Sequence, residues 1–195
     1  MKRAVRAIRV SLEAAACAAL ACGLRLIMAG METIAIIGGG ASGLMAAVEA
    51  SLALRQAGAA AHVALFEADP ERIGRSILAT GNGRCNISNA CISADAYRNH
   101  AFVEEALMHL QSGYAVERGA ACTRTLEANP VLERFADMGL VMREESEGRL
   151  YPMANKATSV LDVLRSTAAE LGVDVQTDKH ALRVDAPAPG GSGCF

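Results

Sequence analysis

Residues 33–67 read TIAIIGGGASGLMAAVEASLALRQAGAAAHVALFE, and this stretch decides the fold. The apolar run 34–37 predicts a short β-strand, because it is rich in β-branched residues and too short for a helix. A helical pattern follows over residues 42–57 and ends at Gly58, a residue suited to closing a helix. A second apolar run, 62–66, predicts another strand. The order is that of a nucleotide-binding βαβ unit in a parallel sheet, which makes the fold class α/β.

A glycine-rich turn lies between the first strand and the helix. Gly38, Gly40 and Gly43 have G-x-G-x-x-G spacing. In such a turn the first glycine permits the tight bend, the second lets the backbone approach a pyrophosphate, and the third lets the helix pack close to the sheet. Ala41 and Ser42 begin the helix, whose free N–H groups and dipole favour phosphate. The turn therefore predicts a Rossmann-like dinucleotide site.

An acid closes the second strand. Glu67 follows the last glycine at about the 20-residue distance expected for the carboxylate that binds the adenosine ribose. A carboxylate at that place disfavours a 2′-phosphate, so the bound adenosine is not expected to belong to NADP. With 18 glycines in 195 residues, the glycine spacing alone is a weak signal. The flanking strands and the acid make it strong, but they do not separate FAD from NAD.

Composition excludes several other classes of function. The chain has 4% aromatic residues, no Trp and a net charge of −2, which argues against a nucleic-acid partner. The six cysteines show no C-x-x-C spacing and the four histidines are dispersed, so no metal site is expected. We expect reduced thiols and a cytoplasmic protein. Cys85 has no resolving partner nearby in the sequence and is interpreted as a small buried residue rather than a catalytic thiol.

The two ends of the chain differ in composition from the rest. Residues 1–30 combine basic residues with the apolar stretch 14–24, which superficially resembles a signal peptide but contains too few residues to span a bilayer. We interpret this region as an extension outside the fold, with a targeting peptide and a membrane anchor as the alternatives. Residues 31–186 form the expected nucleotide-binding domain. Residues 187–195 are a Pro- and Gly-rich tail that ends where a further strand is expected.

A second glycine-rich segment, ATGNGRCNISN, covers residues 79–89. Its Gly and Asn content predicts tight turns with exposed backbone N–H groups rather than a helix or a central strand. Arg75 and Arg84 add guanidinium groups whose forked donors suit phosphate. The residues alone leave an ordinary surface loop as an equal alternative.

Three stretches resemble one family. GGGASGLMAA, FEADPERIGRSILATGNGRCNISN and EGRLYPMANKATSVLDVLR are similar to the bile-acid-reductase-like flavoproteins of the BaiN/YhiN type, NAD(P)/FAD-dependent oxidoreductases of which some carry an aminoacetone oxidase label. Ser76 replaces the lysine usual in that family. The T-G-N-G-R-C-N string is the most specific match. The resemblance spans about residues 31–186, and because family members are longer, we expect an N-terminal portion of a Rossmann-like FAD/NAD(P)-binding fold.

The resemblance implies FAD as cofactor, NAD(P)H as a transient reductant, and hydride passing through the flavin to a small unsaturated or keto substrate. It names no catalytic residue, and with the composition we expect no nucleic-acid or membrane partner. A catalytically inactive fragment and an NAD-binding Rossmann module are the alternative hypotheses. The expected cofactor-binding residues are Gly38, Gly40, Ala41, Ser42, Gly43, Glu67, Arg75, Gly81, Asn82, Gly83, Arg84, Cys85, Asn86 and Ala181.

Further elements are expected beyond residue 89. Helices are predicted over 94–110, with Phe102, Leu107 and Leu110 facing inward, from Pro130 to near residue 139, and over 160–171 with Thr158 as cap. Residues 140–143 and 149–151 predict a hairpin across an acidic turn, and 173–176 and 182–184 predict strands.

Overall fold

The computed structural model describes residues 9–14, 32–91, 93–110 and 130–185. The chain divides into two units, one made of residues Met1–Arg75 and Leu164–Phe195 and the other of Ser76–Val163. Each is described by itself.

The first unit contains a three-stranded parallel sheet in the order β2-β3-β7. These strands are β2 (Glu32–Ile37), β3 (Ala61–Phe66) and β7 (Asp174–Gln176). In register, Ile34 lies opposite Val63 and Ala64 opposite Asp174. The strands predicted at 34–37, 62–66 and 173–176 are therefore confirmed.

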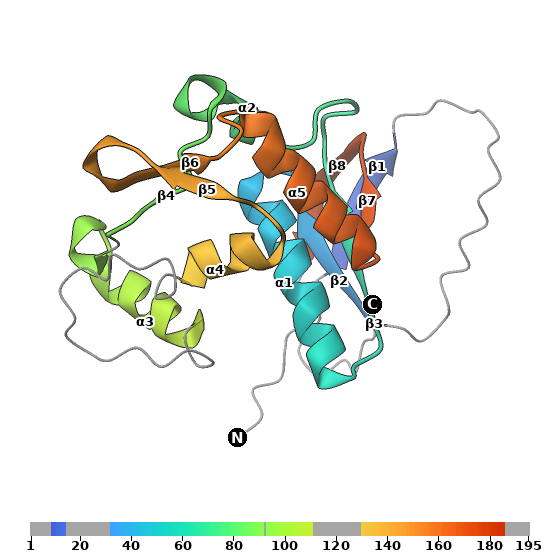
Figure 1. The fold of residues 1–195 in the computed structure, drawn as a ribbon. Helices are drawn as coiled ribbons and strands as arrows, with labels where there is room; N and C mark the ends of the chain where they lie inside the picture. Colours follow the sequence, from blue (N-terminus) through green and yellow to red (C-terminus); the bar gives the residue numbers. More distant parts are fainter. Residues whose placement is uncertain (1–8, 15–31, 92, 111–129, 186–195) are drawn as a thin grey trace. The chain divides into compact units, whose positions relative to one another are not determined.

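Helix α1 (Ala41–Ala57) connects β2 to β3, and this crossover makes the two strands parallel (Figure 1). The helix buries Leu44, Ala47, Val48 and Ser51, residues that recur at helical spacing. It ends at Gly58, whose φ of 60° is left-handed and whose N–H donates to the carbonyls of the last turn. The predicted strand–turn–helix–strand unit is present with the predicted helix end.

A second, antiparallel pair of strands belongs to the same unit. Strand β8 (Lys179–Asp185) pairs with β1 (Arg9–Ala14), so that Leu12 lies opposite Ala181. The predicted strand at 182–184 is thus part of a longer one. Strand β1 falls within the residues expected to form an extension, and the boundaries proposed for that extension stay a prediction.

The second unit contains an antiparallel sheet in the order β4-β6-β5. Strands β5 (Met142–Glu144) and β6 (Arg149–Pro152) form the predicted hairpin, joined by the 3-10 turn η5 (Ser146–Gly148). The edge strand β4 (Ser88–Asn89) pairs with β6 and was not expected. It lies at the sheet edge, so the expectation that residues 79–89 form no central strand holds.

Short helices complete the second unit. They are α2 (Arg75–Ala79), whose first residue still belongs to the first unit, η1 (Thr80–Gly83), η2 (Ala94–Ala96), α3 (His100–Leu110) and α4 (Pro130–Asp137). Helix α4 starts at Pro130 as predicted. The helix predicted over 94–110 is instead η2 followed by α3, and Phe102 is 65% exposed, so its expected inward position is wrong. The side chains of Leu107 and Leu110 lie outside the described residues.

Helix α5 (Ala157–Glu170) begins in the second unit and ends in the first. It buries Val160, Leu164 and Ala168, which share one face of a helix. The helix starts earlier than predicted, so Thr158 lies in its first turn and is not its cap.

Candidate functional site

The glycine turn after β2 has a backbone geometry that favours glycine at two of its positions. The Gly38 N–H donates to the Phe66 carbonyl at 2.7 Å, which ties the end of β2 to the end of β3. Gly38 has φ +97°, and a Cβ added there would meet nothing within 4 Å. A Cβ on Gly43 would lie 3.0 Å from the carbonyl carbon of Gly38 and closer still to its oxygen. The first and third glycines therefore serve the turn and the close helix packing that the spacing predicts.

The N-terminus of α1 faces this turn without a side-chain cap. Gly40 is the N-cap residue and, lacking a side chain, makes no side-chain capping hydrogen bond. The first turn of the helix holds no acidic residue. The Gly40 carbonyl accepts the first helical hydrogen bond, from the Leu44 N–H at 3.0 Å. The N–H groups of a helix's first turn have no partner within the helix. This end of α1 therefore offers donors and a positive dipole to an anion.

Glu67 joins the end of β3 to the glycine turn. Its Oε2 accepts the Gly39 N–H at 2.6 Å and its Oε1 accepts the Asp69 N–H at 2.9 Å. Its backbone N–H donates to the Gln176 carbonyl at 2.8 Å, and its carbonyl accepts from Lys179 N–H at 2.9 Å. Backbone bonds to β7 and β8 thus hold the acid in place. The sequence predicted Glu67 at the end of the second strand, but its contact with Gly39 was missed, because the only signal of Gly39 was its position inside the glycine run.

The T-G-N-G-R-C-N segment in the second unit is a series of left-handed residues. Gly81, Asn82, Gly83 and Cys85 have φ of 53°, 55°, 80° and 58°. Within it the Arg84 N–H donates to the Gly81 carbonyl at 3.1 Å. Left-handed backbone is unfavourable for ordinary residues and tolerated by Gly and Asn, which explains the composition of the segment. The predicted tight turns are confirmed, but the expectation of no helix is wrong, because Thr80–Gly83 form the 3-10 helix η1. Cys85 is buried, as expected of a small apolar residue.

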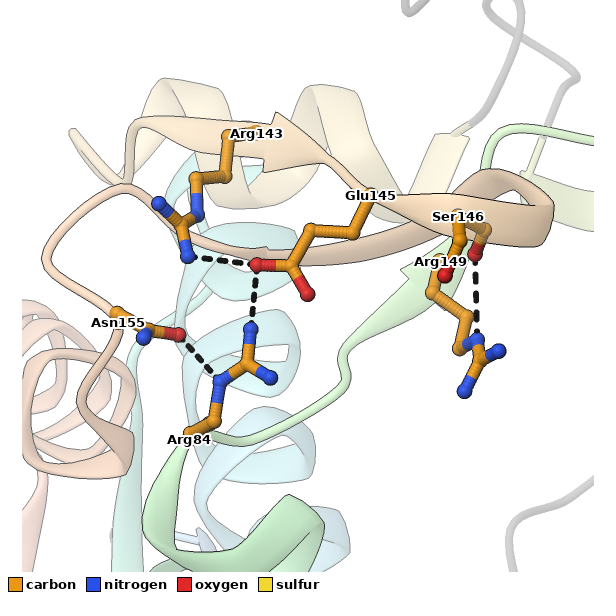
Figure 2. A network of polar contacts seen from close by, with 6 residues as sticks. All are labelled: Arg84, Arg143, Glu145, Ser146, Arg149 and Asn155. Atoms are coloured by element: carbon orange, nitrogen blue, oxygen red, sulfur yellow. Dashed lines mark hydrogen bonds and ion pairs between the residues drawn. The ribbon is translucent and has the colours of Figure 1, made fainter.

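Arg84 anchors this segment to the β5–β6 hairpin and to the turn after β6, as Figure 2 shows. Its Nε donates to Asn155 Oδ1 at 2.5 Å, its terminal nitrogen pairs with Glu145, and its guanidinium lies 4.2 Å from the centre of the Tyr151 ring. Arg143 donates to the same Glu145 oxygen at 2.6 Å. Arg84 therefore holds the loop to its neighbours, a role that its sequence position alone did not reveal.

The charges in this network stabilise one another. The hydrogen bond from Arg84, followed by the charges of Arg84 and Arg143, holds the pKa of the Glu145 carboxyl below its ordinary value. The hydrogen bond to Glu145 raises the pKa of the Arg84 guanidinium. The two side chains remain 28% and 34% exposed, so solvent screens their attraction.

The structure places the predicted site residues in two groups. Gly38, Gly40, Ala41, Ser42, Gly43 and Glu67 meet around the glycine turn of the first unit. Arg75 and Ala181 belong to the same unit, Arg75 at the start of α2 and Ala181 in β8. Gly81, Asn82, Gly83, Arg84, Cys85 and Asn86 lie together in the second unit.

Two further features were not found among the described residues, a metal-binding cluster and a membrane-spanning helix. Among them, no group of three His, Cys, Asp or Glu side chains could hold a metal ion. None of their helices combines the length and the apolar character needed to cross a bilayer.

Comparison with known proteins gives several similarities. The 3-dehydro-bile acid delta(4,6)-reductase of Clostridium scindens is 35% identical over 158 residues, which are 80% of this chain and 32% of that protein. The chain thus spans about a third of the length of this curated relative. Among solved structures, THI4 of Thermovibrio ammonificans aligns with 76% of this chain and 38% of its own, at 19% identity and a TM-score of 0.43. BexE, studied for oxidation during BE-7585A biosynthesis, aligns with 76% of this chain and 24% of its own, at 21% identity and a TM-score of 0.35. Structural likeness at this level carries no functional information.

A family model described as the HI0933-like protein Rossmann domain matches residues 32–190. Together with the reductase, this match confirms the resemblance read from the three sequence stretches and the Rossmann-like fold read from the glycine turn. Because the match covers most of the sequence, the chain belongs to the HI0933-like family.

Proposed function

We propose that this chain is the nucleotide-binding part of an FAD-dependent oxidoreductase. The observation that carries the proposal is the 2.6 Å hydrogen bond from the Gly39 N–H to Glu67 Oε2. It brings the acid at the end of β3 to the glycine turn at the end of β2. In Rossmann folds this is where the pyrophosphate and the adenosine ribose of a dinucleotide bind. The reductase name of the curated relative supports an oxidoreductase.

The residues of the first unit fit such a ligand. The open space beside Gly38 leaves its backbone accessible to a phosphate, and the uncapped start of α1 presents N–H donors at Gly40, Ala41 and Ser42. Each oxygen of Glu67 accepts one backbone N–H. A carboxylate oxygen has two lone pairs, so each retains capacity for a ribose hydroxyl.

The remaining assignments rest on the family resemblance. We assign contacts with FAD to Arg75, to Gly81, Asn82, Gly83, Arg84, Cys85 and Asn86, and to the backbone at Ala181. Two of the five N–H donors of Arg84 bind Asn155 and Glu145, which leaves donors for an anion. When bound, FAD would supply hydride-transfer chemistry, with NAD(P)H as transient reductant and a small unsaturated or keto compound as substrate. A cytoplasmic protein without nucleic-acid or membrane partners is part of this proposal.

Titration of the purified 195-residue chain with FAD tests the proposal. We expect a saturable change in visible absorption and flavin fluorescence. ADP should compete, since it carries the ribose and the diphosphate, and NADP⁺ should compete poorly because Glu67 repels a 2′-phosphate. Binding of NAD⁺ in place of FAD would support a plain NAD module instead. Binding of neither nucleotide would point to an inactive fragment, and either result overturns the proposal.

A further inference from the structure

Gly39, the middle residue of the glycine run, is held on several sides at once. Its N–H donates to Glu67 Oε2 at 2.6 Å, and its carbonyl accepts the Gly74 N–H at 2.8 Å. A Cβ added to Gly39 would lie 2.6 Å from Cγ1 of the buried Ile73 and 3.0 Å from Glu67 Oε2. The segment 69–74 therefore closes directly onto the glycine turn, at a glycine outside the G-x-G-x-x-G positions.

Asp69 folds that segment. Its own N–H donates to Glu67 Oε1 at 2.9 Å. Its Oδ1 accepts two backbone N–H groups, from Glu71 at 3.0 Å and from Arg72 at 2.9 Å. These bonds turn the chain within a few residues, so that the residues which follow, Ile73 and Gly74, reach Gly39. An aspartate that bonds the backbone two and three residues ahead is a turn-forming arrangement.

The contacts form a closed ring. It runs from Gly39 to the Glu67 carboxylate, on to Asp69, through the folded segment to Gly74, and back to Gly39. The ring restricts the Glu67 carboxylate, because one of its oxygens accepts the Gly39 N–H and the other accepts the Asp69 N–H. A carboxylate held in this way keeps one orientation before any ligand arrives, which lowers the entropy lost on binding.

We propose that Asp69 is a positioning residue of the nucleotide site, which locks segment 69–74 onto Gly39 and so sets the glycine turn and the Glu67 carboxylate before the nucleotide binds. The inference rests on the proposed function of the glycine turn. Asp69 itself needs no contact with the nucleotide, since it acts through Gly39 and Glu67. Nothing in the glycine spacing points to it.

The test compares Asp69→Ala with Asp69→Asn. Alanine removes the acceptor of the Glu71 and Arg72 N–H groups, whereas asparagine keeps an oxygen in the same place. Two measurements are made on each variant: amide hydrogen exchange at Gly39 and Gly74 without ligand, and FAD affinity. For Asp69→Ala we expect exchange to be about tenfold faster or more and FAD affinity to fall by a similar factor, since hydrogen bonds to charged groups contribute at that level. Asp69→Asn should restore both to within about twofold.

Asp95→Ala is the matched control, because Asp95 is an exposed aspartate of the second unit. It should change neither exchange at Gly39 nor affinity. Circular dichroism checks folding, and if Asp69→Ala does not fold, Asp69→Ser takes its place with an intermediate effect expected. Unchanged exchange in Asp69→Ala or its replacement would refute the ring, and faster exchange with unchanged affinity would reduce Asp69 to a purely structural residue.

Exchange is measured without ligand, so the two proposals fail separately. A wild-type chain that protects Gly39 but binds no FAD would overturn the proposed function and, with it, the role of Asp69 in nucleotide binding. A wild-type chain that binds FAD while Gly39 exchanges freely would overturn only the role of Asp69.

Discussion

Gly43→Ala is the sharpest perturbation of the glycine turn. The added Cβ would lie 3.0 Å from the Gly38 carbonyl carbon and closer to its oxygen, where ordinary van der Waals contact begins at 3.4 Å. The obstacle is backbone, and Gly38 is itself tied to Phe66 by a 2.7 Å hydrogen bond, so no side-chain rotation relieves the overlap. Helix α1 must therefore move away from the end of β2.

The magnitude follows from two opposing effects. Forcing an extra carbon into a packed site costs about 1–3 kcal/mol and occasionally more. Alanine favours a helix over glycine by up to about 1 kcal/mol, and by less in the first turn, where Gly43 lies. Overpacking wins, and we expect a net loss of about 2 kcal/mol in the free energy of unfolding. For a chain of this size that lowers Tm by about 4–8 °C. FAD affinity should fall more than tenfold, since the helix N-terminus leaves the phosphate position.

The assay is thermal unfolding followed by circular dichroism, together with FAD titration. Ser42→Ala is the matched control for stability, because Ser42 is exposed in the same helical turn and gains no atom. It should stay within about 0.5 kcal/mol of the wild type, as surface substitutions do. A Gly43→Ala protein with the stability of the control and the FAD affinity of the wild type would show that the contact between Gly43 and Gly38 does not hold the turn.

Three further predictions concern single side chains. Glu67→Gln should weaken FAD binding and speed amide exchange at Gly39, because one of the two backbone N–H groups that donate to Glu67 then faces an amide donor instead of an acceptor. FAD affinity and amide exchange, measured by NMR, that equal those of the wild type would contradict this. Arg84→Lys should make the T-G-N-G-R-C-N segment more susceptible to limited proteolysis, because an ammonium lacks the fork that reaches Asn155 and Glu145 together; an unchanged cleavage pattern would count against the anchoring role. The lowered pKa of Glu145 predicts that its contribution to stability is present above its unfolded pKa, near 4.5, and is lost as the pH falls through the folded pKa. In Glu145→Gln the unfolding midpoint should therefore drop less steeply on acidification than in the wild type. Parallel curves of unfolding midpoint against pH for the two proteins would refute this link between the pKa and stability.

Local sequence pattern predicted most of the first unit. The strands at 34–37 and 62–66, the helix between them and the left-handed end at Gly58 are all present. Each depends on residues close in the chain: β-branched runs, a helical period and a glycine that adopts positive φ without strain. The hairpin of β5 and β6 was predicted for the same reason. The family match confirmed the resemblance carried by the glycine motifs.

The errors lie where distant contacts decide. Phe102 is apolar at a plausible inward position of a helix, yet it is exposed, because helical period does not say which face finds a neighbour. Strand β4 was missed because two residues carry no periodic signal, and its pairing with β6 joins segments far apart in the chain. The contacts of Arg84 with Glu145 and Asn155 were not predicted, because these partners come near it only once the chain is folded, and its role toward phosphate stays a prediction.

Steric rules and residue spacing act within a short stretch of chain, so the amino-acid sequence was enough to predict the βαβ unit, the place of the glycine turn and the acid that follows it. The folded structure was needed to show that Gly39 is hydrogen-bonded to both Glu67 and Gly74, and that Asp69 folds the segment between them. The reason is that a hydrogen bond joins two groups whose approach depends on the paths of both segments, and Gly39 and Glu67 are 28 positions apart in the sequence.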